Sequence, residues 1–328
     1  MSTGASPVVK GGRVSVTRLY DVAYAIDLAR VERDADTAPT RGRLERARPR
    51  SIRYTEPPLD LALGDASVET RGGPVTVRSS ARLFDFGAVR LSYTLELPRT
   101  GWEEVVARVD ELEAISEAAE PWSADLAHVL ALIDPALEKP VQPVLEIDHT
   151  FATIFGFEPR LTAAQILSGI DLAPLLTGET RALSPAARAE LLRDALTYYE
   201  DDLVVIGPAR SLIVEPGGEP DVADVLGVAL AQLLELRAYD QLLAAELIAM
   251  HARVERARRG FGALARRRYA ALAQALYGLP GELTSVSAGV EKAPGGNGVP
   301  LVIGQVGASA FEANMKAMSI LGRLVQVG

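Results

Sequence analysis

The stretch DVADVLGVALAQLLELRAYDQLLAAELIAMHARVERAR, residues 221–258, decides the fold because it is the longest regular pattern in the chain. Its apolar residues recur at alternating steps of four and three, the spacing that lines up side chains along one face of an α-helix. We call this face the seam; it consists of Val222, Leu226, Ala229, Leu233, Leu236, Asp240, Leu243, Leu247 and Met250. The spacing predicts a helix of about 38 residues, roughly 57 Å long.

Few globular domains bury both ends of so long a helix, so we expect the seam to pack in a helical hairpin or in a dimeric coiled coil. Gly260 and Gly262 mark the natural break, and residues 263–277 would form the returning helix. Asp240 is the polar residue of the seam. A buried Asp240 would need a partner such as Arg237 and would fix the register of helix pairing, whereas a slightly rotated helix would expose it.

Upstream of residue 215, strand patterns alternate with short helical patterns. Alternation and turn residues predict strands at 13–28, 67–70, 75–84, 89–97 and 144–157, and a hairpin over 197–214. Helical spacing and capping residues predict helices at 102–115 and 123–133, the second capped by Ser123, and short helices starting at Thr162 and Ser184. We therefore expect an α+β domain at 1–215, a long helical hairpin at 221–279 and an appended segment at 291–328.

The appended segment reads as strand, helix and strand, in LVIGQVG, ASAFEANMKAMSIL and GRLVQVG (residues 301–328). This order predicts one βαβ unit. A single βαβ unit cannot cover both faces of its own strands, so it must dock on the rest of the chain, exchange with a partner or stay partly disordered.

Two segments and one turn carry a resemblance to a known family. YYEDDLVVI (198–206), VADVLGVALAQLLELRAYDQLL (222–243) and the Phe84-Asp85-Phe86-Gly87 turn resemble bacterial relatives of the "required for meiotic nuclear division" proteins, a family of unknown function. The resemblance spans about residues 13–280. It implies an α+β part followed by a helical hairpin. Members of that family usually continue into a membrane-anchoring segment, for which this sequence shows no counterpart.

The tail carries a different resemblance. VGASAFEANMKAMSILGRLVQVG (306–328) is similar to the end of the nucleotide-binding domain of medium-chain alcohol dehydrogenases and quinone oxidoreductases. Gly304 and Gly307 lie between an expected strand and an expected helix, which is the position of a phosphate-binding loop. Their spacing is not GxGxxG, and no acidic residue follows at the distance that the motif requires. We therefore interpret them as a structural turn and expect no cofactor.

Composition excludes several kinds of chemistry. The chain has no cysteine and three histidines, which rules out disulfides and thiolate metal sites and disfavours a multi-histidine metal centre. HExxH, GxSxG and P-loop motifs are all missing from the sequence. A Ser–His–Asp site assembled from distant residues stays open as an alternative.

The densest acidic cluster is Glu200-Asp201-Asp202. Its carboxylates could supply part of the shell of a hard divalent cation. However, successive strand residues point to opposite faces and cannot all converge on one ion. A solvated bend, with Asp201 or Asp202 bonded to local backbone N–H groups, is the favoured interpretation. We expect Tyr198 and Tyr199 beside it to be sheet residues.

Arginines gather at the far end of the long helix. They are Arg253, Arg256, Arg258, Arg259, Arg266, Arg267 and Arg268. Such a tip could bind the phosphates of RNA or of an anionic lipid headgroup. It could equally be a solvated helix end, where the helix dipole favours cations. The formal net charge of −9 argues against generic nucleic-acid binding by the whole surface, and we expect no sequence-specific nucleic-acid binding.

These patterns together predict a non-enzymatic scaffold or interaction protein that self-associates, or docks on a protein partner, through residues 221–264. A partial NAD(P)-dependent oxidoreductase is one alternative, suggested by the tail alone. A peripheral RNA or anionic-membrane binder acting through the arginine tip is the other. The apolar share of 48% and charged share of 23% are ordinary for a soluble protein, and we expect it in the cytoplasm, with attachment to a membrane periphery as the alternative.

Overall fold

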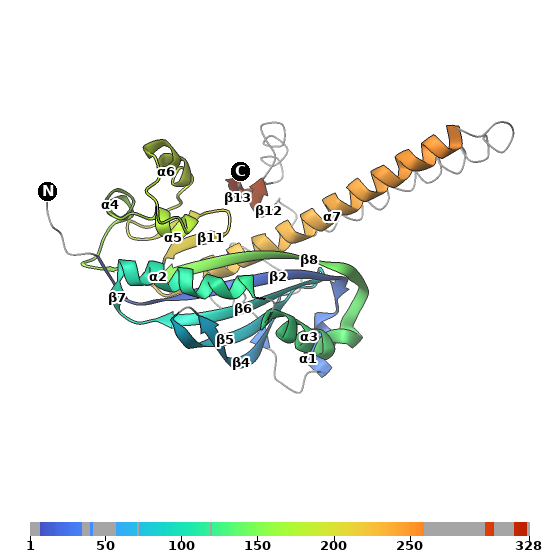
Figure 1. Ribbon diagram of the computed structural model, residues 1–328, viewed down its shortest axis with the longest axis horizontal. Helices are drawn as coiled ribbons and strands as arrows, with labels where there is room; N and C mark the ends of the chain where they lie inside the picture. The colour runs from blue at the N-terminus through green and yellow to red at the C-terminus, as the bar shows by residue number, and fades with distance from the viewer. Residues whose placement is uncertain are drawn as a thin grey trace.

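A mixed eight-stranded sheet forms the centre of the molecule (Figure 1), with strand order β10-β11-β8-β2-β6-β5-β4-β3. The computed structural model describes residues 7–34, 40–41, 57–70, 72–118, 120–258, 299–304 and 318–326. β11 runs parallel to β8, and every other neighbouring pair is antiparallel. The strands are β2 (Gly12–Ile26), β3 (Thr40–Arg41), β4 (Leu59–Thr70), β5 (Gly73–Leu83), β6 (Ala88–Leu97), β8 (Leu137–Ile154), β10 (Leu203–Ile206) and β11 (Arg210–Val214).

Helices and two small sheets complete the described part. The helices are α1 (Leu28–Asp34), α2 (Trp102–Glu113), α3 (Trp122–Ile133), α4 (Ala163–Gly169), α5 (Ala173–Thr177), α6 (Pro185–Leu191) and α7 (Asp221–Arg258), with 3-10 turns at Ala114–Glu117 and Asp134–Ala136. One small sheet consists of β7 (Thr100–Gly101), β1 (Val8–Val9) and β9 (Phe157–Glu158), and the other pairs β12 (Val299–Gly304) with β13 (Met318–Gln326). β12 and β13 are parallel, as a βαβ unit requires.

The two faces of the sheet pack against different helices because side chains alternate along each strand. On β2, Val14, Val16 and Tyr20 belong to the main core with α2 and α3. Leu19 points the other way and packs with residues of α7. The hairpin turn before β6 needs Gly87, whose φ is +94° and whose Cβ would lie 1.7 Å from the carbonyl oxygen of Ala23.

The first half of α7 lies on the sheet through seam residues and through neighbouring residues that are not part of the seam. Val228, Ala231 and Leu234 are at most 4% exposed and pack with Leu19 and Ala88 of the sheet. These α7 residues recur every three positions, which is also a helical spacing, but they are not seam residues. The seam residue Leu226 is also buried, against Phe151 of β8 and Ile213 of β11, and Ala229 is buried as well. The packing of the seam in a hairpin or a coiled coil stays a prediction.

Most predicted elements are confirmed. α7 has the predicted bounds, the meander corresponds to β4, β5 and β6, and Thr162 caps α4 in a capping box with Gln165. Ser123 does not cap α3, because the helix begins one residue earlier and the Ser123 hydroxyl donates to Glu120. The mixed α and β content is as expected. The predicted returning helix at 263–277 and the helix of the tail lie outside the described residues, so a hairpin is not shown.

In the part of the chain that the structure describes, no helix has the length and apolar character needed to cross a membrane.

Candidate functional site

The far half of α7 extends beyond the sheet as a stalk (Figure 1), which we define as residues 236–258. Large apolar side chains are exposed along it: Leu236 is 46% exposed, Leu242 62%, Leu247 63% and Ile248 72%. Exposure of single apolar residues is normal, whereas several on one projecting helix are typical of an interaction surface.

Two of these residues belong to the seam. Leu236 and Leu247 are eleven positions apart, about three helical turns, so they lie on the same side of the stalk. Leu242 and Ile248 lie on other sides of the helix. Asp240, between the two seam leucines, is exposed in the single chain as they are, so its exposure does not decide between the two alternatives predicted for it. The side chains of Leu243 and Met250 are outside the described part.

A buried charge network fastens the root of α7 to the sheet. Arg82 Nη1 donates to Asp224 Oδ1 at 2.6 Å, and its Nε and Nη2 donate to Asp60 at 2.5 and 2.9 Å. Arg90 Nη2 lies 3.8 Å from the same oxygen of Asp224. Arg90 passes close under the helix at Gly227, where a Cβ would lie 1.7 Å from its Nη1. The network is buried and oriented, so it sets where the helix sits on the sheet.

A hollow of about 380 Å³ beside this network is polar. Three of its four arginines pair with carboxylates that line the same hollow: Arg78 with Glu96, Arg82 with Asp60 and Asp224, and Arg90 with Asp224. The positive charges of these three arginines are thus balanced by the negative charges of the carboxylates they pair with. The side of the hollow next to α7 is therefore explained by the way the helix is anchored, whereas Arg13, on the far side, has a buried Nη2 without a hydrogen-bond partner.

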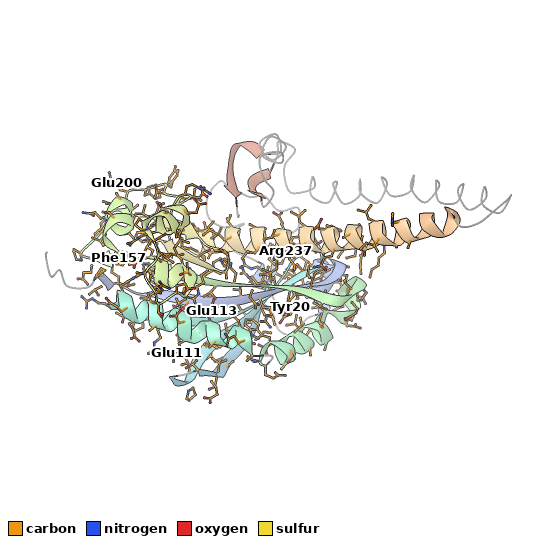
Figure 2. The ribbon with its side chains drawn as sticks, turned by 45° about the horizontal axis from the view of Figure 1, so that its top comes forward. Tyr20, Glu111, Glu113, Phe157, Glu200 and Arg237 are labelled. Carbon is orange, nitrogen blue, oxygen red and sulfur yellow. The ribbon has the colours of Figure 1, made fainter. Side chains whose placement is uncertain are left out.

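A second cavity, of about 240 Å³, lies between the root of α7 and strands β8, β10 and β11. Its lining is part polar and part apolar, and the apolar side chains come from both sides: Ile147, Phe151, Ile206, Leu226, Leu230 and Leu233. His149 and Ser211 supply buried polar groups, Asp148 is half-buried, and Glu146, Pro208 and Arg237 are its exposed members. Figure 2 shows Arg237 on α7, above the sheet.

His149 is the unusual residue of this cavity. It is 3% exposed, and burial lowers its pKa to about 4, so its ring is neutral at pH 7. Nε2 shares a hydrogen bond of 2.8 Å with Ser211 Oγ, while Nδ1 is buried without a hydrogen-bond partner. Buried polar atoms are nearly always satisfied, so an unpaired one needs an explanation.

The arrangement is not a Ser–His–Asp triad. Asp148 is the neighbouring acid, but its carboxylate accepts from Arg18 Nε and Nη2 at 2.5 and 2.7 Å. Asp148 and His149 are consecutive on β8 and so point to opposite faces of the sheet. Among the described residues, no carboxylate reaches Nδ1 of His149, and the group that would orient the base is missing.

Glu235, on α7 itself, is a second ionisable group that is largely removed from water. Its pKa is raised to about 8, chiefly by burial and also by the negative charge of Asp21 on β2, while a hydrogen bond with Tyr239 acts in the opposite direction. Burial also raises the pKa of Asp21, which is 6% exposed. The Glu235 carboxyl is thus mainly protonated at neutral pH.

The acidic cluster at 200–202 is a solvated bend, as predicted. Asp202 Oδ1 accepts from the backbone N–H groups of Tyr198 and Tyr199 at 2.7 and 3.0 Å, and Asp201 pairs with Arg160 at 2.9 Å. Within the described ranges, no group of three histidine or acidic side chains could hold a metal ion. The expectation that Tyr198 and Tyr199 are sheet residues is wrong: they lie in the bend, 72% and 67% exposed, because the strand begins only at Leu203.

The other predicted site residues are only partly described. Arg253, Arg256 and Arg258 lie in the last turns of α7, but their side chains are outside the described part. Arg259, Arg266, Arg267 and Arg268 are outside it altogether. Gly304 ends β12, and Gly307 is not described.

Sequence reasoning missed the cavity, although two signals point to it. His149 alternates with Ile147 and Phe151 along an apolar strand, and Ser211 opens the apolar run of β11. Alternation predicts that both point to a buried face. That β8 and β11 are neighbours, which brings the two residues together, is a property of the tertiary structure alone.

Comparison with known proteins finds one family. The model of the N-terminal domain of the uncharacterised protein MJ0711 matches residues 11–221, a range that contains β2 to β11 of the sheet and ends at the first residue of α7. No curated protein and no solved structure matches the chain.

Proposed function

The chain belongs to the uncharacterised family of the MJ0711 N-terminal domain, and we propose that it is a non-enzymatic interaction protein that self-associates through the seam of α7. The observation that carries this proposal is the exposure of Leu236 and Leu247 on one side of a projecting helix. Burying an exposed leucine contributes about 1.5–3 kcal/mol. A second copy offers the same spacing of four and three, which is what interlocking helices need.

Asp240 bears on the orientation of such a pair. In a parallel pair in register, the two Asp240 side chains would face each other and repel. In an antiparallel or staggered pair they separate, and an arginine of the other copy, such as Arg237, can meet each one. Asp240 would then specify the register, as single polar seam residues do in coiled coils.

The test compares two double variants with identical chemistry on the same stalk. Leu236→Lys/Leu247→Lys places charge on the seam, and Leu242→Lys/Ile248→Lys places it on other sides of the helix. We expect sedimentation velocity to show association of the full chain, loss of association in the seam variant and retention in the control.

A wild-type chain that stays monomeric at its highest soluble concentration would contradict self-association. If the seam variant of such a monomer is also destabilised, the seam is covered within the chain, by the predicted returning segment 263–277.

A second candidate function concerns the tail. The parallel pairing of β12 with β13 supports a βαβ unit, and hence the similarity to nucleotide-binding domains of oxidoreductases. Fluorescence titration with NAD(P)H tests it, and saturable micromolar binding would favour this candidate. We expect no binding, because residues 299–328 lack the glycine motif that holds the pyrophosphate.

A further inference from the structure

We propose that the polar hollow beside the root of α7 binds a small hydroxylated organic acid, with its single carboxylate placed at Arg13. This is the hollow of about 380 Å³, which is lined by β2, β4, β5, β6, β8 and the start of α7. The site is separate from the seam, and the proposal does not depend on self-association.

The lengths of the side chains shape the hollow. Alternate residues along a strand point to the same face of the sheet, and in the centre of this face they are serines and threonines. The register places Thr17 opposite Ser92 and Ser92 opposite Ser80, so hydroxyl residues form one row across β2, β6 and β5. On β5 the longer side chains of Arg78 and Arg82 flank this row. Short residues between long ones leave a depression with hydroxyl groups in its floor.

The charges of the hollow leave one arginine unbalanced. Four arginines and three carboxylates line it, so its net charge is one positive. The two arginines next to α7 pair with Asp60 and Asp224, and Arg78 pairs with Glu96 at 3.7 Å on the exposed rim. In the part of the chain that the structure describes, Arg13 pairs with none of these three carboxylates. A ligand with one negative charge would balance it.

Arg13 is held in position at the far side of the hollow. Its guanidinium carbon lies 5.9 Å from the centre of the Phe155 ring, a cation–π contact that orients the group. Nη2 is enclosed by protein atoms and takes no part in binding, whereas Nε and Nη1 are not enclosed in this way. The carboxylate would meet the guanidinium through these nitrogens, in a charge-assisted hydrogen bond.

The floor selects the rest of the ligand. Among the described residues, the hydroxyls of Ser80 and Ser92 have no hydrogen-bond partner. A hydroxyl both donates and accepts, so a ligand that carries several hydroxyls matches this floor. A cavity of about 150 Å³ holds benzene, so the hollow of about 380 Å³ holds a molecule roughly twice that size. A sugar acid derived from a hexose has this size, these hydroxyls and one carboxylate.

A second negative charge on the ligand is disfavoured. It would lie near Asp60, Glu96 or Asp224, which line the same hollow, and like charges repel. This separates a carboxylate from a phosphate monoester, which carries close to two negative charges at pH 7.

Isothermal titration calorimetry of the full chain tests the proposal with three probes at constant ionic strength. Gluconate carries the carboxylate and the hydroxyls, sorbitol is the same carbon chain without the carboxylate, and glucose 6-phosphate carries the larger charge. We expect gluconate to bind saturably and about tenfold more tightly than either of the others, the worth of one hydrogen bond to a charged group. No saturable binding of gluconate, or equal or tighter binding of either other probe, would overturn the proposal.

Two variants locate the site. Arg13→Gln removes the unbalanced charge, and we expect it to weaken gluconate binding about tenfold. Arg160→Gln, which removes an exposed arginine outside the hollow, is its control and should bind normally. Ser80→Phe fills the floor without changing any charge and should abolish binding, whereas Thr76→Phe, exposed on the same strand outside the hollow, should not. Urea unfolding identifies the folded variants, and undiminished binding by folded Arg13→Gln or folded Ser80→Phe would reject the site.

Discussion

Glu235 on α7 and His149 on β8 are both largely removed from water, yet their pKa values shift in opposite directions. Burial disfavours the charged form of each: the carboxylate for Glu235, whose pKa rises to about 8, and the imidazolium for His149, whose pKa falls to about 4. At neutral pH both groups are therefore mainly neutral. The stability of the chain should depend on pH with a different sign for each residue.

Glu235→Gln tests this for the carboxyl. The folded-state pKa is above the ordinary value of 4.5, so the contribution of Glu235 is full below pH 4.5 and is lost as pH rises through about 8. The variant mimics the protonated form and should remove this loss, raising stability at pH 8 by about 1–3 kcal/mol after allowance for partial exposure. Urea unfolding at several pH values across the window measures it. Glu200→Gln, at an exposed position, is the control, and equal pH profiles for the two variants would refute the assignment.

At the scale of the element, α7 is one helix with two apolar faces. Both contact the sheet over the first turns, and the seam is exposed farther along. Over the first turns, Val228, Ala231 and Leu234 and the seam residue Leu226 all pack on the sheet, and the seam alone continues past the sheet into the stalk. A 3.6-residue period allows both faces on one helix, provided that the residues between them are small or polar. Gly227 is one such residue, because Arg90 occupies the space that a Cβ would need.

The charge network at the root should hold the helix in place. Asp224→Asn removes the negative charge that Arg82 meets at 2.6 Å, and both side chains are buried. Breaking a buried pair costs about 3–5 kcal/mol, and because Arg82 keeps Asp60 we expect about 2–3 kcal/mol. Chemical denaturation measures this loss.

Asp194→Asn provides the control for that substitution. Asp194 pairs with Arg193 at 3.6 Å on the surface, with both side chains at least 60% exposed. Exposed pairs contribute about 0–1 kcal/mol, so this change should be nearly silent. Equal losses in the two variants would show that burial does not strengthen the Asp224 pair.

At the scale of the whole molecule, the eight-stranded sheet has helices on both faces, and Figure 1 shows α2 and α7 on opposite sides of it. β12 and β13 pair only with each other and form no part of this sheet in the described structure. The tail does contact the molecule, since β12 lies against α7.

Deleting residues 291–328 should therefore leave the sheet folded. Because the deleted strands donate no hydrogen bonds to it, we expect a cooperative thermal transition, shifted by no more than a few degrees. Circular dichroism and differential scanning calorimetry of the shortened chain measure this. Loss of the cooperative transition would mean that the tail completes the core.

Local pattern was enough to predict α7 from Asp221 to Arg258, the meander of β4, β5 and β6, and the β10–β11 hairpin. Each depends on a periodicity or a turn within a few residues, which the sequence displays directly. The bend at Glu200–Asp202 was predicted for the same reason, because its hydrogen bonds are local.

Only the tertiary structure decided which face of α7 meets the sheet and which residues form the cavity. Both apolar faces of the helix have helical spacing, and that Val228, Ala231 and Leu234 join the seam on the sheet depends on complementarity with Leu19 and Ala88, which are about two hundred and one hundred and forty residues away in the chain. His149 and Ser211 meet because β8 and β11 pair in parallel, a non-local contact that no pattern along one strand contains. Periodicity specifies an element, whereas the pairing of distant elements depends on the free energy of the whole packed core.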